Sequence, residues 1–571
     1  MKRMIALLLT LALVFCFFAA CGDKKGEAKT PDGTGPQSTQ TPPDTANVSD
    51  GDMNYYLTQL RSMKTYPSDT ATLNMTYYTA LTSLSYFGHY LDHAIMYYTF
   101  FESLMEWDCI NSRIEGNLAE SWEWIDETTL RVKLHPGITS IAGDPVTASD
   151  VLWSLNFNND TGLLATYYSY LDMPACKVVD DLTVDLATKS AYPYLPLDLC
   201  SFYFAIGCEK TARDIAYDEA TGTWDQDVLD WDPSYGTGPY KLIELDPTET
   251  FYKCERNENY WNETKPYYKY INVFSVLDAS TRAFSLEAGN YQFVDQLSAA
   301  QAAPFIDNDD FRLWNLSTLG AVVIFRINTA YEPLRIKELR QALALAIDYE
   351  TLCEVACGGL AEPAYNAMVT TTSEYYKLPE AEKNFVRYDP ELAKEKLKEA
   401  GFADGITLEF KFANSQTRDS KTAESLQFMF KQVGVTLEVV PLEAITFFDQ
   451  VKAGDFQVAM SGATAPNPTN NVYKIDPSKD YSLPGWTNNY WYADLDYLQE
   501  LCNKVYFEVD DAKRADAWTE MQALTDEYIP QIILYQPQNI FVSSSDIVGF
   551  SLSVYGFQNM AWIYPREYIT G

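Results

Sequence analysis

The chain has 571 residues, of which 47% are hydrophobic, and this predicts a globular protein of roughly two to four domains or lobes. Its 79 acidic residues outnumber the 42 basic ones, which gives a formal net charge of −37 at pH 7. This charge argues against nucleic acid and anionic lipid surfaces as partners, because both require a basic face on the protein.

The first residues have the pattern of a secretory signal peptide. Lys2 and Arg3 precede the apolar run 4–18, and two alanines then lead to Cys21. The run is shorter than the roughly 20 residues that a membrane-spanning helix needs. Small residues followed by cysteine resemble a lipoprotein signal, although Phe18 stands where leucine is usual. We therefore expect an extracytoplasmic protein that is anchored to the cell membrane by a lipid on Cys21.

The segment 21–52 follows the signal and contains almost no apolar residues. Such a segment cannot bury enough surface to offset the entropy of folding. We predict a disordered tether that begins at the lipidated cysteine. As a flexible coil of about 30 residues, it would span roughly 30 Å on average.

Two histidines, His89 and His93, are separated by one helical turn, a spacing that can hold a metal ion on a helix. No cysteine or third histidine is near them in the sequence, so we expect them to pack and predict no metal site. The ten cysteines contain no C-x-x-C pattern and predict neither a zinc nor a redox motif. Cys353 and Cys357 are expected to be packing thiols, whereas pairing of Cys200 with Cys208 is left open.

The stretch 118–155 predicts a strand, an ordered turn and a helix. Residues 129–134 alternate apolar with polar, which is the period of a half-buried strand, and His135-Pro136-Gly137 then breaks it. Thr147 and Asp150 form a T-x-x-D helix start, which is followed by Val151, Leu152 and Leu155 on one face.

Three later blocks have equally ordered patterns. The first is GTGPYKL at 236–242, a turn into a strand, followed by CERN at 254–257 and Tyr260-Trp261. The second is FRINT at 325–329, followed by LRQALALAID at 339–348, which predicts a strand, a turn and a helix. The third is YDPELA at 388–393, which opens an amphipathic helix that ends at Gly401 and precedes a strand at 406–412 and a helix at 422–433.

These blocks, together with LAESWE and GDPVTASDV inside 118–155, closely resemble the family 5 extracellular solute-binding proteins, the dipeptide and oligopeptide receptors of bacterial ABC importers. The resemblance runs from about residue 70 to 565. It implies an α/β, two-lobed periplasmic-binding-protein-like fold of type II, with an extra inserted domain and a hinge near Phe325 and Ile533–Tyr535. Such receptors close around their ligand by hinge motion.

The resemblance also implies how the chain is divided. The expected parts are a signal peptide (1–20), the lipidated cysteine and tether (21–52), lobe I (53–105, 230–325 and 536–571), the inserted domain (106–229) and lobe II (326–535).

The ligand loop departs from the peptide receptors of the family. These receptors use an aspartate in a D-P-D-N-like loop to pair with the amino terminus of the peptide. Here Asn467 and Thr469 stand at the acidic positions, next to Asn470. A neutral amide cannot make the charge-assisted bond that an ammonium group prefers. This difference keeps a neutral ligand, such as an oligosaccharide, as an alternative to a peptide.

Two further features are candidates for ligand contact. Arg418 lies about where dipeptide receptors keep an arginine for the carboxylate of the peptide, although Asp419 beside it also fits a solvated surface pair. Downstream, Trp486, Asn488, Tyr490 and Trp491 belong to an aromatic and amide cluster that would suit stacking on sugar rings or peptide side chains, or ordinary loop packing.

No P-loop, H-E-x-x-H or G-x-S-x-G motif occurs in the sequence, so we predict that the protein is not an enzyme and uses no cofactor. We expect a monomeric substrate-binding lipoprotein that captures oligopeptides and delivers them to a membrane permease of an ABC importer. An oligosaccharide receptor of the same fold and a non-transport sensor lipoprotein are the alternatives.

Overall fold

The computed structural model describes residues 67–78, 81, 83–85, 98–108, 113–160, 168–246, 248, 250–263, 265–317, 321–366, 368, 385–414, 417–464, 472, 475–478, 492–549, 551–552, 558–559 and 563–566. The chain divides into two units, 1–44 and 45–571, and all described residues belong to the second. The predicted signal peptide, the tether with Cys21, and the pair His89 and His93 lie outside the described residues. Among the helices of the described ranges, none is long and apolar enough to cross a membrane.

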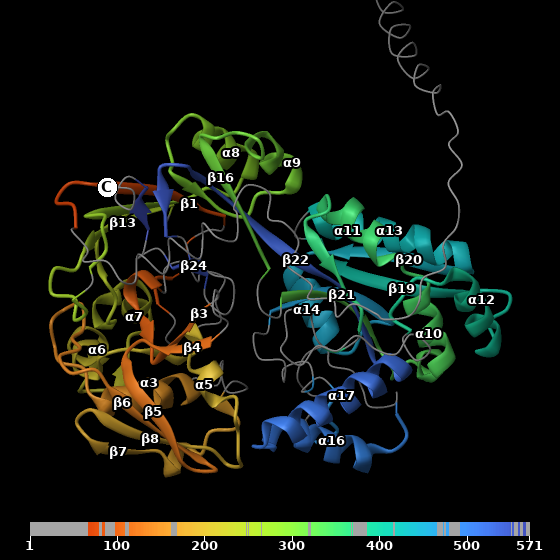
Figure 1. Cartoon of the computed structure of the whole chain (residues 1–571), viewed down its shortest axis with the longest axis horizontal. Coiled ribbons are helices and arrows are strands. Elements are labelled where there is room, and N and C mark those ends of the chain that lie inside the picture. Colours follow the sequence, from red (N-terminus) through yellow and green to blue (C-terminus); the bar gives the residue numbers. More distant parts are fainter. Residues whose placement is uncertain are drawn as a thin grey trace, which may run out of the picture. The chain divides into compact units, whose positions relative to one another are not determined.

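A 12-stranded mixed sheet organises the described part of the chain (Figure 1). The strands of its main path, in spatial order, are β12 (Tyr240–Leu245), β13 (Phe251–Arg256), β14 (Tyr270–Ser275), β1 (Thr72–Tyr77), β15 (Phe293–Val294), β22 (Gln531–Ser544), β17 (Ala321–Ile327), β21 (Val458–Thr464), β19 (Ile406–Ala413) and β20 (Val435–Leu442). Two further strands, β16 (Phe311–Ser317) and β18 (Ala361–Pro363), pair with β22 off this path.

The long strand β22 belongs to two groups of strands at once. Its C-terminal half pairs with β15 and β16, whereas its N-terminal half pairs with β17 and β18. The two chain crossings that the sequence predicts near Phe325 and Ile533–Tyr535 lie on β17 and β22, which are antiparallel neighbours. These two strands therefore connect the strand group around β1 with the strand group around β19.

A separate four-stranded sheet contains β5 (Ala119–Asp126), β6 (Thr129–Leu134), β8 (Thr183–Ala187) and β7 (Lys177–Asp180), and helix α3 (Ala148–Asp160) packs on it. The strand predicted at 129–134 is thus confirmed, with Leu130 and Val132 buried. The predicted helix start is confirmed as well. The carboxylate of Asp150 accepts hydrogen bonds from the backbone N–H (2.8 Å) and the hydroxyl (2.9 Å) of Thr147.

The helices surround these sheets, and many of them begin at an aspartate. The longer helices are α6 (Glu209–Ala216), α7 (Gln226–Trp231), α8 (Ala279–Glu287), α10 (Lys337–Leu345), α11 (Tyr349–Cys357), α12 (Pro390–Glu399), α13 (Thr417–Val433), α14 (Ala444–Lys452), α16 (Leu495–Phe507) and α17 (Asp511–Tyr528). The aspartates that cap helix N-termini in this set are Asp225, Asp278, Asp348, Asp389, Asp494 and Asp510. Part of the acidic excess therefore satisfies the exposed N–H groups of helix starts.

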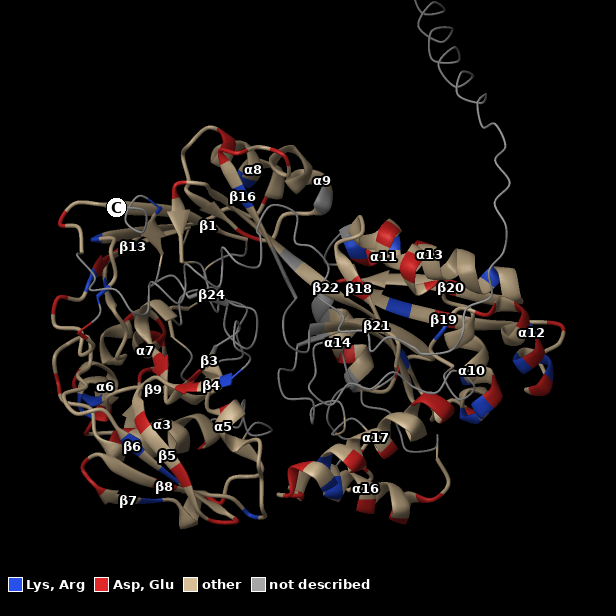
Figure 2. Cartoon of the chain, in the orientation of Figure 1, with Lys and Arg blue, Asp and Glu red and all other residues tan. Residues whose placement is uncertain are grey.

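Short elements complete the described structure. They are α5 (Leu195–Asp198), α9 (Ala299–Ala302), β2 (Glu102–Ser103) with β9 (Ala205–Ile206), β3 (Met105–Asp108) with β4 (Arg113–Gly116), β10 (Tyr217–Asp218) with β11 (Thr223–Trp224), β23 (Ile547–Val548) with β26 (Tyr564–Pro565), and β24 (Ser551–Leu552) with β25 (Gln558–Asn559). Charged residues of both signs are distributed over the helices, as on α12 and α16 (Figure 2).

Two large apolar cores hold the fold together. One lies between the strands β17, β19, β20 and β21 and the helices α10 to α13, and it contains Phe325, Leu343, Phe410 and Phe430. The other extends from β1 and β14 through the four-stranded sheet to α16 and α17. The seven described cysteines outside the signal are free thiols, so Cys200 and Cys208 are not paired, and Cys353 and Cys357 pack within α11 as predicted.

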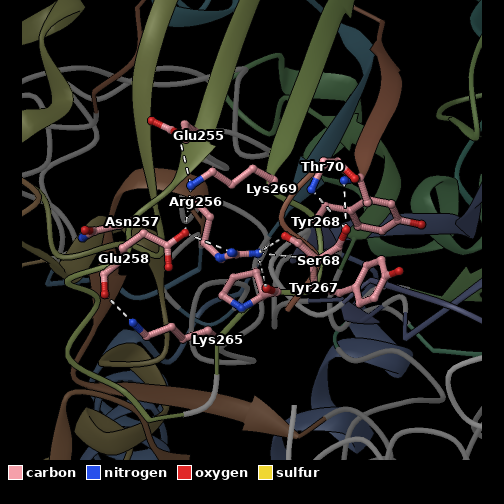
Figure 3. A network of polar contacts seen from close by, with 12 residues as sticks. Ser68, Thr70, Glu255, Arg256, Asn257, Glu258, Lys265, Tyr267, Tyr268 and Lys269 are labelled. Atoms are coloured by element: carbon pink, nitrogen blue, oxygen red, sulfur yellow. Dashed lines mark hydrogen bonds and ion pairs between the residues drawn. The ribbon is translucent and has the colours of Figure 1, made fainter. Parts of the chain in front are cut away.

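Several sequence motifs owe their form to arginines that bind backbone carbonyl oxygens. Arg256 of the CERN motif is 1% exposed and donates from Nη1 to the carbonyl oxygens of Ser68 (2.9 Å) and Tyr267 (3.1 Å). Its Nη2 donates to Oε1 of Glu258 at 2.9 Å (Figure 3). This buried guanidinium joins the start of β1 to the loop before β14, which gives the motif a structural role.

Arg340 of the RQALA motif has the same role in the other core. Its Nε donates to the carbonyl oxygens of Tyr528 (2.9 Å) and Ile529 (3.0 Å), and its Nη1 donates to those of Leu334 and Arg335. Burial lowers the pKa of Arg340 to about 10. Because the last carbonyl groups of a helix lack partners inside it, Arg340 completes the C-terminus of α17.

The GTGPY motif and Tyr260-Trp261 meet around one buried carboxylate. Glu102 accepts hydrogen bonds from the hydroxyl of Tyr260 (2.6 Å) and from Nε1 of Trp261 (2.9 Å). Burial raises the pKa of Glu102 to about 7, and these two bonds oppose the rise. A Cβ atom on Gly238 would lie 2.5 Å from the carbonyl carbon of Phe100, so only glycine permits this close approach.

Candidate ligand-binding site

Arg418 is the one predicted ligand residue that lies within the described ranges. It occupies the first turn of α13, and its side chain is 28% exposed. Its Nε lies 3.8 Å from Oδ1 of Asp419, a carboxylate that is itself 16% exposed. This pair is half-buried, and its N–O distance is long for a hydrogen-bonded ion pair. The role of Arg418 in ligand contact stays a prediction.

The guanidinium of Arg418 lies next to the long strand β22. The hydroxyl of Tyr535, on β22, is 2.8 Å from Oγ1 of Thr422, one turn after Arg418. Burial raises the pKa of the Cys357 thiol, at the end of α11, and the charge of Arg418 opposes that rise. The Nε of Arg418 makes no hydrogen bond with any described residue. A half-buried cation whose Nε makes no hydrogen bond with a described residue therefore lies where α11, α13 and β22 meet.

Strand topology places the start of α13 and the end of β21 at the same edge of the sheet. Strands β19 and β21 are parallel, with Phe412 paired to Met460. After β19 the chain enters α13, and after β21, which ends at Thr464, it enters the loop that contains Asn467. Because the carboxyl ends of parallel strands share an edge, the start of α13 and the end of β21 at Thr464 lie at one edge of the sheet, the usual location of ligands in α/β folds.

The remaining predicted ligand residues lie outside the described residues. They are Asn467, Thr469, Asn470, Trp486, Asn488, Tyr490 and Trp491. Their role in ligand contact therefore stays a prediction.

Arg326 is a second arginine near this edge, and the sequence analysis did not single it out as a site residue. It lies on β17 between the buried Phe325 and Ile327, so its side chain points away from their core. Its Nε donates to the hydroxyl of Ser461 on β21 at 2.6 Å, and burial lowers its pKa to about 10. In the sequence, Arg326 could have been found as the single charged residue in the otherwise apolar strand AVVIFRI.

In the strand group around β1, a buried ion pair follows the carboxyl end of β15. Oδ1 of Asp295 lies 3.7 Å from Nε of Arg282, and Oδ2 accepts a hydrogen bond from the N–H of Tyr78 at 3.3 Å. Burial raises the pKa of Asp295 to about 7, and Arg282 opposes the rise. Arg282 also donates to four backbone carbonyl groups, so this pair anchors the loop at that edge.

Within the described ranges, no group of three or more His, Cys, Asp or Glu residues is arranged to hold a metal ion. His135, of the turn His135-Pro136-Gly137, packs its ring 5.2 Å from that of Trp261. Arg418 has an Nε without a hydrogen bond to a described residue, and its guanidinium can form charge-assisted hydrogen bonds with a carboxylate.

Comparison with known proteins gives this geometry a context. Residues 113–481 match the family described as bacterial extracellular solute-binding proteins, family 5 Middle. The glutathione-binding protein GsiB of Pectobacterium atrosepticum is 28% identical over 354 residues, which are 61% of this chain and 64% of that protein. The chain therefore spans a little under two thirds of the length of this relative.

Two solved structures share the fold. NikA from Brucella suis, in complex with Fe(III)-EDTA, has a TM-score of 0.74 and 18% identity, covering 87% of this chain and 100% of that chain. The dipeptide binding protein from Pseudoalteromonas sp. SM9913, in complex with Met-Leu, has a TM-score of 0.70 and 19% identity, with the same coverage. These similarities confirm the predicted two-lobed α/β periplasmic-binding-protein fold.

Proposed function

Because the chain belongs to the family 5 extracellular solute-binding proteins of bacterial ABC importers, we propose that it captures oligopeptides and delivers them to a membrane permease. Members of this family are extracytoplasmic binding proteins and not enzymes, in agreement with the sequence prediction. Under this proposal the ligand binds at the edge shared by α13 and the loop after β21, and hinge motion at β17 and β22 closes the lobes around it.

The observation that carries the proposal is the state of Arg418. The Nε of this half-buried guanidinium lies 3.8 Å from Oδ1 of Asp419 and makes no hydrogen bond with any described residue. A desolvated donor of this kind is costly unless a ligand completes it. The planar fork of arginine matches a carboxylate, which every unmodified peptide carries at its C-terminus.

The finer parts of the proposal rest on the sequence. Asn467, Thr469 and Asn470 would contact the other end of the peptide, and Trp486, Asn488, Tyr490 and Trp491 would contact its side chains. The protein would act as a monomer, held at the membrane by a lipid on Cys21. In the neutral loop at Asn467, backbone carbonyl oxygens would accept the hydrogen bonds of a peptide ammonium group.

A thermal-shift screen tests this function. The purified protein is heated with a pool of di- and tripeptides that includes glutathione, and separately with a pool of short oligosaccharides. A ligand at about a hundred times its dissociation constant should stabilise the fold by roughly 2.7 kcal/mol. A shift with the peptide pool supports the proposal, whereas a shift with sugars alone replaces it.

The second candidate is an oligosaccharide receptor of the same fold. It is favoured by the neutral residues Asn467 and Thr469 at the acidic positions of peptide receptors, and by the aromatic cluster around Trp491. A sensor lipoprotein that passes a signal without transport is a third reading. Transport assays with an ABC permease reconstituted in vesicles, with and without the protein, separate the receptor of an importer from a sensor.

A further inference from the structure

Tyr194 connects two parts of the molecule that are far apart in the sequence. It immediately precedes α5, in the part of the chain between β8 and β9, and is 5% exposed. Its hydroxyl accepts a hydrogen bond from Nε1 of Trp518 on α17 at 2.9 Å. The same hydroxyl donates to the carbonyl oxygen of Val505 on α16 at 3.1 Å. One phenol group thus binds both helices of the α16–α17 hairpin.

The hairpin provides a fitted site for this tyrosine. Trp518 and Val505 are completely buried, and the guanidinium carbon of Arg514 lies 5.6 Å from the centre of the Tyr194 ring. The hydroxyl of Tyr194 both donates and accepts a hydrogen bond, and its ring packs among buried side chains. Such a tyrosine binds with little loss of entropy, because only two torsion angles are ordered.

Neighbouring tyrosines hold Tyr194 in place from its own side. The ring of Tyr192 lies 5.7 Å from that of Tyr194 and stacks on Tyr170 at 3.9 Å. The hydroxyl of Tyr192 donates to Oδ2 of Asp198 at 2.9 Å, which fixes this group of three tyrosines to α5. The anchor is therefore presented by a rigid group of aromatic side chains, and little conformational entropy is lost when the hairpin receives it.

The hairpin, in turn, is mechanically joined to the strands that connect the two lobes. α17 has 18 residues, a length of about 27 Å, and its C-terminus is fixed to α10 by Arg340 and Gln341. Only Ile529 and Pro530 separate α17 from β22. A contact at Trp518 therefore acts on helix α17, whose C-terminus leads directly into β22, one of the strands that connect the lobes.

We propose that Tyr194 and the α16–α17 hairpin form a latch that favours the closed arrangement of the lobes. This inference rests on the proposed function, in which closure accompanies ligand capture. Tyr194 and Trp518 are positioning residues, which raise affinity by stabilising the closed, ligand-bound arrangement against opening. A receptor with a weaker latch binds the same ligand with the same contacts but releases it sooner.

The test compares Tyr194→Phe and Trp518→Phe with Tyr240→Phe, which removes a buried hydroxyl that binds the carbonyl oxygen of Tyr268 at 3.0 Å within lobe I. Small-angle scattering of the ligand-free proteins measures closure, and surface plasmon resonance with glutathione measures rates. A neutral hydrogen bond supports a change of roughly two- to tenfold. We expect the two latch variants to have a larger radius of gyration and a glutathione dissociation rate raised by this factor, with an association rate no lower than that of the wild-type protein.

Tyr240→Phe should lower the melting temperature without changing scattering or rates. If both latch variants scatter like the wild-type protein in the absence of ligand, the latch is overturned and the contact is a fixed interface. If glutathione does not bind the wild-type protein, the proposed ligand fails, but ligand-free scattering still decides the latch.

Discussion

Arg340 and Arg418 both lie on helices packed around the strands β17 to β21, yet their guanidinium groups have opposite environments. Arg340 is fully buried and donates hydrogen bonds to four backbone carbonyl groups inside the fold. Arg418 is half-buried, and its Nε has no hydrogen-bond partner among the described residues. We therefore expect Arg340 to stabilise the fold, and we propose that Arg418 is available to a ligand.

The largest expected effect is at Arg340. Arg340→Met should lower the free energy of unfolding by roughly 3 kcal/mol or more, because each buried carbonyl that loses its donor costs about 1–3 kcal/mol. Urea denaturation measures this change, with Arg113→Met, at a side chain that is 64% exposed, as the control. An Arg340 variant as stable as the control would contradict the stabilising role of this arginine.

Glu102 is a buried carboxylate that, like Arg340, has its hydrogen-bond partners inside the fold. The pKa of Glu102 is raised to about 7 in the folded state, so between pH 4.5 and 7 the folded protein binds this proton more tightly than the unfolded chain. The contribution of Glu102 to stability is present at the low end of this window and is lost as the pH rises through it. Glu102→Gln should flatten the pH dependence of the unfolding free energy by roughly 2–3 kcal/mol.

Thermal melts of the wild-type protein and of Glu102→Gln from pH 5 to 8 measure this change. Glu120→Gln, which removes an exposed carboxylate bound to Lys133, should leave the wild-type slope intact. Parallel curves for the wild-type protein and Glu102→Gln would contradict the assignment.

Arg418 should give the opposite division of effects. Arg418→Gln is expected to weaken peptide binding by about 10- to 100-fold, or roughly 1.5–3 kcal/mol, because a charge-assisted bond to the carboxylate is lost. Its unfolding free energy should change by less than about 1 kcal/mol. Isothermal titration calorimetry and urea denaturation measure the two quantities. A variant that loses stability and keeps its affinity would move Arg418 into the structural class.

The smallest effect concerns the predicted aromatic contact. Trp491→Ala should weaken binding of either a peptide or an oligosaccharide by roughly tenfold, since aromatic contacts contribute about 0.5–1.5 kcal/mol beyond their buried area. Titration with the ligand found in the screen measures the change, and Trp124→Ala, at an exposed edge strand, is the control. Unchanged affinity would remove Trp491 from the proposed site.

Local patterns predicted the elements that depend on local physics. The strand at 129–134, the start of α3 and the strand β19 follow from alternation and capping residues that are neighbours in the sequence. Helix α13 begins at Thr417, five residues before the predicted start, because its first turn is polar and shows no apolar face.

Long-range contacts set the limit of this reasoning. Glu102 and Tyr260 are 158 residues apart, and Tyr194 and Trp518 are 324 residues apart, so no local pattern pairs them. For Arg418, the sequence supplied its chemistry and approximate position, but its burial and spare donor depend on β22 and α11 packing against α13.

The most direct test of the account is calorimetric titration of the wild-type protein with di- and tripeptides and with the same peptides as C-terminal amides. If Arg418 recognises the carboxylate of a captured peptide, the free acids should bind and the amides should bind about 10- to 100-fold more weakly. Equal affinity for acids and amides, or binding of oligosaccharides alone, would contradict the account.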